Sequence, residues 1–211
     1  MRRRSVDASM TDLPKVKDHL LSSRFGADDL PPEDGTGVYA FFLAGSTVLA
    51  GMRAEPRGLI YVGAAESSAD VRDQFACADS GFSTLRRSLG ALLKEQLRLR
   101  AIPRGLPQSK ATRNYRFCDN SELRLALWMR ANLRYGFILV PREVKSVARA
   151  LIADLGPPLN LIHWPNPQGP YLRALRAICR DEAHRFLGSP GNDRAALPEF
   201  EAGTPRLFRG D

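Results

Sequence analysis

Two tyrosines in this chain stand in short apolar segments flanked by glycine, and a tyrosine hydroxyl can take part in catalysis. The segments are Gly37-Val38-Tyr39 and Tyr61-Val62-Gly63, which lie roughly twenty residues apart. A tyrosine with its ordinary pKa of about 10 is a poor base, so it needs nearby positive charge to act. Arg86 and Arg87 follow the second segment. A fixed cation is most useful where negative charge develops, as on a phosphodiester under attack.

Each of these residues also has a purely structural explanation. Tyr39 and Tyr61 are typical of aromatic residues packed across a β-hairpin, and Gly63 is typical of a turn at a strand end. Arg86 and Arg87 can be ordinary charges on a helix surface. Only the joint placement of these residues favours a function, so the elements that carry them decide between the two interpretations.

The net charge of +8 and the isoelectric point of about 9.9 favour a polyanionic partner. The charge is concentrated between Phe82 and Arg116, where nine basic residues accompany a single acid, Glu95. We interpret this block as a surface that follows phosphates, with a solvated helix face and a basic loop as the alternative. The residues assigned to substrate binding are Gly63, Lys94, Arg98, Arg104, Lys110 and Arg113.

Both tyrosine segments fall on predicted β-strands. Strands are expected over 37–43 and 58–63, and the Gly and Pro residues between them predict an antiparallel hairpin. Further strands are expected over 114–118 and 135–140, and helices over 15–22, 121–133, 143–155 and 171–187. This order predicts an α+β fold, with a small, mainly antiparallel β-sheet flanked by helices.

A helix that begins at Ser83 and runs past Leu97 to a stop at Pro103 is expected to carry the basic residues. Five leucines recur there at three- and four-residue spacing, which predicts one apolar stripe. Arg86 lies at the edge of this stripe, where it can point into a cleft. The residues predicted to lie on the opposite face are Arg87, Lys94 and Arg98.

We divide the chain into an N-terminal extension over 1–34, a central domain over 35–165, a C-terminal helix over 166–188 and a flexible tail over 189–211.

No run approaches the ~18 apolar residues of a membrane helix, and no apolar stretch follows the basic start as in a signal peptide. The chain is therefore expected to be intracellular, in the cytoplasm. Its three cysteines and three histidines show no metal-ligand spacing.

The two tyrosine segments, the basic helix and the later element Pro157-Pro158-Leu159-Asn160 occur in an order that resembles the GIY-YIG nuclease family. That family includes excision-repair incision subunits, homing endonucleases and some restriction enzymes. The resemblance covers roughly residues 35–165, and it depends on the combination because no single motif is specific. It implies a GIY-YIG-like domain that hydrolyses phosphodiester bonds in DNA with a divalent metal.

By this resemblance, Tyr39 and Tyr61 lie side by side on the central hairpin, and a tyrosine activates or positions the attacking water. An arginine on the first helix stabilises the phosphate, for which Arg86 and Arg87 are the candidates. A glutamate on a later helix holds the metal, which is usually Mg²⁺, with Mn²⁺ as the alternative. Asn160 braces the site.

Three positions depart from the family pattern. Ala64 stands where a lysine commonly follows the second tyrosine segment, and Ser88 stands where the helix arginine is expected. Ala148 occupies the position of the glutamate, three residues before Leu151. Glu143 is the carboxylate assigned to the metal in its place, although it lies ~140° around the helix from Ala148.

The favoured function is a DNA-acting phosphodiesterase, namely a GIY-YIG-type endonuclease. The missing glutamate leaves a second hypothesis open, a catalytically degenerate module that keeps the fold and binds nucleic acid. A third hypothesis is a domain whose basic surface binds an acidic protein. The final helix is expected to extend the DNA contact or to form a homodimer, because it carries Arg173, Arg176, Arg180 and Arg185.

Overall fold

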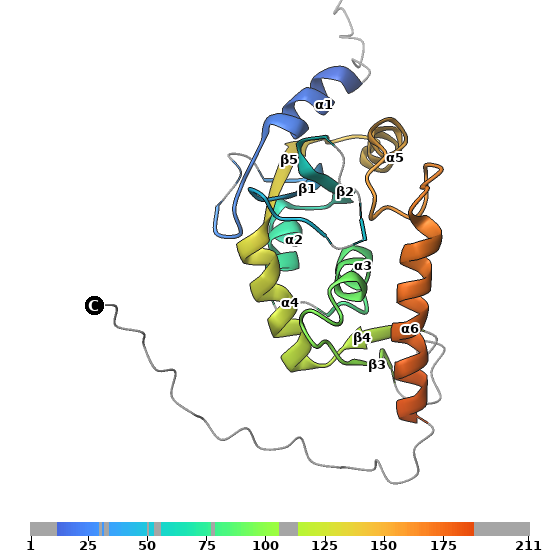
Figure 1. Ribbon diagram of the computed structural model, residues 1–211. Coiled ribbons are helices and arrows are strands. Elements are labelled where there is room, and N and C mark those ends of the chain that lie inside the picture. Colours follow the sequence, from blue (N-terminus) through green and yellow to red (C-terminus); the bar gives the residue numbers. More distant parts are fainter. Residues whose placement is uncertain are drawn as a thin grey trace, which may run out of the picture.

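The computed structural model describes residues 12–29, 31, 34–49, 51–52, 56–76, 79–105 and 114–187. Over these ranges the chain has the predicted α+β fold (Figure 1). Lys110, Arg113 and the tail over 189–211 lie outside the described residues. The elements in chain order are α1 (Leu13–Ser22), β1 (Gly37–Leu43), η1 (Pro56–Gly58), β2 (Leu59–Ala65), α2 (Ser68–Arg72), η2 (Asp73–Phe75), α3 (Thr84–Leu92), β3 (Ala101–Pro103), β4 (Tyr115–Phe117), α4 (Asp119–Asn132), β5 (Leu133–Leu139), α5 (Val144–Leu155) and α6 (Gly169–Leu187).

β1 is the central strand of a three-stranded antiparallel sheet with the order β2-β1-β5. The predicted hairpin of β1 and β2 is confirmed, and its register pairs Tyr39 with Gly63 and Phe41 with Tyr61. β3 and β4 form a separate two-stranded antiparallel sheet at the other end of the molecule (Figure 1). The sheets are thus small and antiparallel, as the sequence indicates.

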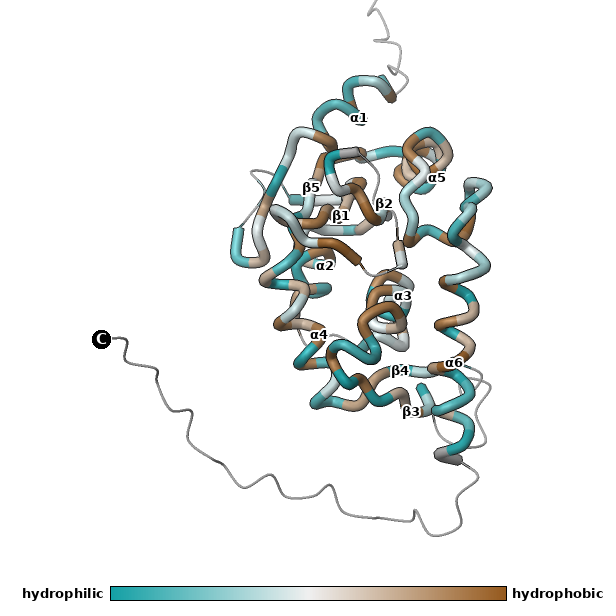
Figure 2. The backbone as a smooth tube through the Cα atoms, in the orientation of Figure 1, coloured by the Kyte–Doolittle hydropathy of each residue, from teal (hydrophilic) through white to brown (hydrophobic). Residues whose placement is uncertain are grey.

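The central sheet is buried on both faces, because alternate residues of a strand point to opposite sides. Val38, Ala40 and Phe42 pack with α1 and α5. Tyr39 and Phe41 point the other way, toward the layer that contains α3, α4 and α6. Figure 2 shows hydrophobic residues concentrated in β1 and β2 and on α3 and α5. The motif tyrosines therefore lie between the sheet and the layer of α3 and α6.

α3 begins where the sequence predicts but ends earlier. The Arg86 amide donates a hydrogen bond to the Ser83 hydroxyl at 3.1 Å, which caps the helix. The prediction of a helix past Leu97 is wrong, because α3 ends at Leu92 and the chain continues in turns. Arg98 has a φ of 50°, a left-handed conformation that cannot continue a right-handed helix.

Besides the short 3₁₀ turns η1 and η2, two short elements were not predicted, and one of them has a clear sequence signal. α2 starts with a capping box, in which the Asp70 amide donates to the Ser67 hydroxyl at 3.2 Å and the Ser67 amide donates to the Asp70 carboxylate at 2.9 Å. A Ser-x-x-Asp motif before an apolar residue is typical of a helix start. The other element is β3, whose Ala101 pairs with Phe117 of β4.

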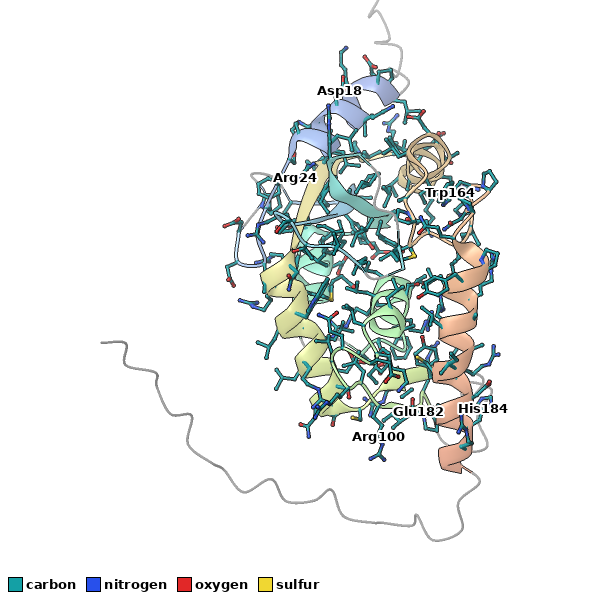
Figure 3. All side chains as sticks on the ribbon, viewed as in Figure 1. Asp18, Arg24, Arg100, Trp164, Glu182 and His184 are labelled. Carbon is teal, nitrogen blue, oxygen red and sulfur yellow. The ribbon has the colours of Figure 1, made fainter. Side chains whose placement is uncertain are left out.

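α6 runs along one side of the molecule, and α4 runs along the opposite side (Figure 1). α6 packs against β3 and α3 of its own chain. An ion pair supports this packing, with Lys94 Nζ 2.9 Å from Oε2 of Glu182. Glu182 lies on α6 and is labelled in Figure 3. Neither α6 nor any other helix in the described ranges is long and apolar enough to cross a membrane.

Candidate active site

Tyr39 and Tyr61 are diagonal neighbours on one face of the hairpin. Tyr61 lies opposite Phe41, and Tyr39 lies opposite Gly63. The two tyrosine rings have centroids 6.1 Å apart and planes tilted by 30°. Long side chains in such diagonal positions are within reach of each other. The hairpin thus brings together two hydroxyls from separate segments of the chain.

Gly63 makes room for this arrangement. A Cβ at this position would lie 2.5 Å from both the Cζ atom and the hydroxyl oxygen of Tyr39. A side chain here would therefore push the Tyr39 ring off β2. The sequence assigns Gly63 to substrate binding, and the structure places it both against Tyr39 and in the wall of the pocket beside Tyr61.

Burial raises the pKa of both tyrosines above the ordinary value of 10.0, and the rise is larger for Tyr39. A hydrogen bond between the two hydroxyls raises the pKa of Tyr39 and lowers that of Tyr61. The charges of Arg176 and Arg87 lower the pKa of Tyr61 further, against the effect of burial. Burial thus keeps both hydroxyls protonated at neutral pH.

Asn160 holds the outer edge of β2 with its side-chain amide. Its Oδ1 accepts from the Val62 amide, and its Nδ2 donates to the Val62 carbonyl, both at 2.9 Å. The Leu159 amide donates to the Ile60 carbonyl at 3.0 Å. An exposed strand edge has unpaired backbone groups, and this segment satisfies them as another strand would. Asn160 therefore fixes β2 next to Tyr61.

A pocket of about 650 Å³ opens beside Tyr61. Its walls come from β2, the first residue of α3, α5, the segment after Asn160, and α6. The charged residues among those that line it are Lys145, Arg149 and Arg176, and no described lining residue is acidic. Fixed cations without an opposing charge favour the binding of an anion such as a phosphate.

The GIY-YIG catalytic domain family matches residues 39–180, which is more than half of the 211 residues. The chain belongs to the GIY-YIG family. No curated protein and no solved structure gives a significant match. The family match begins at Tyr39 and reaches Arg180 on α6, so it extends beyond the segment 35–165 that carries the resemblance. The fold is therefore of a nuclease type, and nucleic acid is the class of substrate that it suggests.

The prediction that Arg86 points into a cleft of this GIY-YIG domain is wrong. Its side chain is completely buried, and its Nη2 lies 2.8 Å from Oε2 of Glu122 on α4. The Arg86 guanidinium also donates to the backbone carbonyls of Gln74, Ala76 and Glu122. Arg86 does not line the tyrosine pocket. It instead joins α3 to α4 and to the segment around η2.

The face of α3 opposite the leucines is not a solvent face, because α6 covers it. Arg87 is partly buried, and its Nη1 donates to the Gly81 carbonyl at 2.5 Å. Burial lowers the pKa of Arg87, and so does the nearby charge of Arg176 on α6. Lys94, in the turn after α3, is tied to α6 by its ion pair. Arg87 thus stands near the tyrosines without lining their pocket.

The other described basic residues assigned to substrate binding, Arg98 and Arg104, do not line this pocket. Arg98 is exposed in the turn that follows α3. The Arg104 guanidinium lies over the Phe82 ring, 4.1 Å from its centroid. Phe82 itself is exposed, so this pair forms a separate surface feature.

The residues around the pocket do not fit a magnesium ion. Mg²⁺ prefers oxygen ligands, especially carboxylates. Ala148 lines the pocket at the position of the family glutamate, while Glu143 is exposed just before α5 and does not line the pocket. No group of three or more metal-binding side chains occurs among the residues that the structure describes. Lys145 and Arg149, which flank Ala148 on α5, bring positive charge instead.

Arg176 is a site residue that the sequence shows only as one of several arginines on a predicted helix. It lines the tyrosine pocket from α6. Its Nη1 donates to the hydroxyl of Ser88 at 3.4 Å. Ser88 occupies the place where the family resemblance puts an arginine on α3. α6 therefore supplies a guanidinium at the position where α3 has a serine, and no local sequence signal predicts this contact.

Arg72 is a second arginine that the sequence reasoning missed. The helix that begins at Ser83 was predicted to be the first after the hairpin, but α2 precedes it and ends at Arg72. The charge of Arg72 lowers the pKa of Tyr135 and Asp34, in each case as a lesser effect. Arg72 does not line the tyrosine pocket. The capping box at Ser67 is the signal that could have revealed this helix.

The buried hydroxyl and thiol groups predict that the fold weakens in alkali. Burial raises the pKa of Tyr39, Tyr61 and Tyr115, and raises that of Cys179 from 9.0 to about 11. As the pH rises above 9, the unfolded chain releases these protons while the folded chain retains them, so stability falls. We expect the free energy of unfolding to be lower at pH 10.5 than at pH 7.5 by more than about 1 kcal/mol. Urea unfolding followed by circular dichroism measures this.

The Cys179→Ala variant is the control for the alkaline effect. It removes the thiol's share of the loss, so its urea midpoint should fall less between the two pH values than that of the parent. Equal midpoints for the parent protein at both pH values would contradict the raised pKa of these groups.

Proposed function

We propose that this GIY-YIG domain is an endonuclease that hydrolyses phosphodiester bonds in DNA at the pocket beside Tyr61. One observation carries the proposal: Tyr61, whose hydroxyl shares a hydrogen bond with Tyr39, lines a pocket whose described charged residues are all cationic. A phosphodiester is an anion that gains charge during hydrolysis, so such a pocket suits it. The net charge of +8 supports a polyanionic substrate.

In this reaction a water oxygen attacks the phosphorus and the bond to the leaving oxygen breaks. The water loses a proton, and the leaving oxygen gains one. Because Tyr61 is protonated at neutral pH, it acts by donating its O–H to a phosphate oxygen, which positions the phosphate for the attacking water. Tyr39 holds Tyr61 in place through their shared hydrogen bond. Tyr61 is therefore the proposed catalytic residue, and Tyr39 is a positioning residue.

The negative charge that grows on the non-bridging oxygens needs a fixed cation. Arg176 is the best placed because it is partly buried and its charge already acts on Tyr61. Lys145 and Arg149 line the same pocket and are exposed, so solvent screens them more. We assign no step to a metal, since the residues that line the pocket do not fit one.

A plasmid-nicking assay with the Tyr61→Phe variant tests this function. Loss of the hydroxyl should reduce the nicking rate by about a hundredfold, since one positioned proton donor contributes on this scale. DNA binding should remain largely intact, because phenylalanine keeps the ring. The assay is run with Mg²⁺, with Mn²⁺ and with EDTA, and binding is followed by fluorescence anisotropy.

Tyr171→Phe is the matched control, because Tyr171 is an exposed tyrosine on α6 that does not line the pocket. It should nick DNA at the parent rate. Normal nicking by Tyr61→Phe would contradict the proposed site. If the parent binds DNA but does not nick it with Mg²⁺, with Mn²⁺ or with EDTA, the domain is a binding module and not a nuclease. Nicking in EDTA would show that side-chain cations suffice.

A further inference from the structure

A second pocket lies directly beside the tyrosine pocket, along α6. Its volume is about 550 Å³, and it shares Leu161 and Arg176 with the first pocket. The two pockets are therefore neighbours along α6, and we call them together the α6 groove. Arg173 and Arg180 line its far part. Because residues three, four and seven apart lie on one side of a helix, this part of the groove runs along α6.

The α6 groove is strongly cationic. Lys145 and Arg149 line one end, Arg176 lies at the junction, and Arg173 and Arg180 line the other end. No acidic residue occurs among the described residues that line either pocket. Of these five cations, Arg180 has a described carboxylate within 4.0 Å, and its separation from Asp181 is 3.8 Å with both side chains well exposed. An exposed pair of this kind neutralises little charge.

Three of the five cations of the groove are held by neutral groups, which leaves their charge available. Arg173 Nη2 donates to the Leu161 carbonyl at 3.1 Å, and Arg176 Nη1 donates to the Ser88 hydroxyl at 3.4 Å. Arg149 Nε donates to the Lys145 carbonyl at 3.1 Å. Such bonds restrain a guanidinium without cancelling its charge.

We propose that the α6 groove binds the sugar–phosphate backbone of the substrate strand and leads it away from Tyr61 along α6. This inference rests on the proposed function, since it takes the scissile phosphate to lie at the tyrosine pocket. Arg173 and Arg180 are seven residues apart, which is about 10 Å along a helix. That length exceeds one nucleotide step, which rises about 3.4 Å along the axis of B-form DNA, so the two arginines reach different phosphates. The cations of the groove thus meet successive phosphates of one strand.

The α6 groove differs from the main surface that the sequence predicts for DNA, to which the final helix was expected only to add an extension or a homodimer contact. That surface was the solvent face of a long helix after Ser83 and the basic loop beyond it. Since α6 covers Arg87 and Lys94, Arg98 is the member of that predicted face that stays exposed. The two surfaces can be compared directly, because each has exposed arginines that can be replaced separately.

The test is a binding measurement on Arg173→Ala/Arg180→Ala in the full chain that also carries Tyr61→Phe. Anisotropy of a fluorescein-labelled 20-nucleotide DNA, as single strand and as duplex, is measured over a range of NaCl concentrations. We expect the affinity at low salt to fall roughly tenfold relative to Tyr61→Phe alone. The slope of log K against log salt should decrease in magnitude by about 1 to 2, as for the loss of one or two phosphate contacts.

Arg124→Ala/Arg130→Ala on α4 is the matched control. It removes the same charge from two exposed arginines of one helix on the opposite side of the molecule (Figure 1). Its affinity should stay within about twofold of the parent value, and its salt slope should stay within about 0.5 of the parent slope. Unchanged circular dichroism of both double variants shows that the fold is intact.

Three results would overturn the inference: no binding by the parent, an equal loss in both double variants, or an unchanged slope in the α6 variant. If Arg98→Ala lowers the slope and the α6 variant does not, the DNA lies at the end of α3. Because binding is read without cleavage, the two proposals can fail separately. If the parent nicks DNA and the α6 variant binds DNA normally, the proposed function stands and the proposed role of the groove is wrong. If the parent binds DNA through the groove and does not nick it, the role of the groove stands and the proposed function is wrong.

Discussion

Replacing Glu122 by glutamine should lower the free energy of unfolding by about 3–5 kcal/mol. Glu122 pairs with the fully buried guanidinium of Arg86 at 2.8 Å. An arginine cannot lose its proton in a protein, so its charge would stay buried and unpaired. The glutamine has one oxygen where the glutamate has two, so its NH₂ would face either the Arg86 N–H or the amides of Ser80 and Phe117, which donate to Oε1 of Glu122. Either orientation sets donor against donor. Urea unfolding followed by circular dichroism measures the loss.

Asp119→Asn is the matched control, because it makes the same change of acid to amide on the same helix. Asp119 forms an ion pair with Arg116 at 3.1 Å, but its side chain is 90% exposed. Exposed pairs contribute about 0–1 kcal/mol, and the loss of an acid in the first turn of a helix costs a similar amount. The two variants should therefore differ by at least about 2 kcal/mol.

The double variant Arg86→Met/Glu122→Gln identifies the cause of the loss. It removes the buried charge together with its partner, so it should be more stable than Glu122→Gln alone. It should remain less stable than the parent, because the carbonyls of Gln74 and Ala76 lose their donor. If the double variant is no more stable than the single one, the unpaired guanidinium is not the cause. This comparison holds even where the single variant is largely unfolded in buffer.

The hairpin and its tyrosines could be predicted because all of their signals are local. Aromatic and β-branched residues, flanked by glycines, mark the strands over 37–43 and 58–63. The end of α5 is also marked by a local signal, since Gly156 has a φ of 59° and supplies the left-handed cap. The pairing of β1 with β2 needs only a turn between them. These features follow from short-range physics and agree with the structure.

The role of Arg86 could not be predicted, because its partner lies 36 residues further along the chain. At the edge of an apolar stripe, an arginine can turn toward solvent, into a cleft, or toward a buried acid. The choice depends on whether another element brings an acid to that position. Here α4 brings Glu122, so burial with a partner is more favourable than exposure, and the cleft interpretation fails.

The cations of the pocket could not be placed for the same reason. A basic helix such as α6 looks like a solvated helix in a sequence, and its inner face depends on what it packs against. Because α6 packs on α3 and β3, Arg176 reaches Ser88 and the tyrosines. The same packing covers the face of α3 that was expected to meet solvent. One tertiary contact therefore accounts for both differences between prediction and structure.

Replacing Arg176 by alanine should reduce the rate of DNA nicking by roughly a hundredfold to a thousandfold. Its guanidinium lines the tyrosine pocket and is partly buried, so water and salt screen it less than the exposed Lys145 and Arg149. Its charge acts where the phosphate gains negative charge. Initial rates at saturating DNA separate this loss of chemistry from weaker binding.

Arg176→Lys and Arg185→Ala sharpen this experiment. Lysine keeps the charge but lacks the planar fork of arginine, so it should recover part of the rate. Arg185 is exposed near the end of the same helix, donates to the Asp181 carbonyl and lines neither pocket. Its replacement should leave the nicking rate within about twofold of the parent. A similar loss in Arg185→Ala would mean that the total charge of α6 matters more than the position of Arg176.

Arg72→Ala decides which helix supplies the catalytic cation. Arg72 stands on the first helix after the hairpin, yet its charge acts on Tyr135 and Asp34, whereas that of Arg176 acts on Tyr61. We therefore expect the loss in Arg72→Ala to be at least tenfold smaller than that in Arg176→Ala. The reverse order would place the scissile phosphate on the α2 side of the hairpin. In that case the α6 cations would serve to hold the strand, since a cation stabilises the transition state only where the new charge forms.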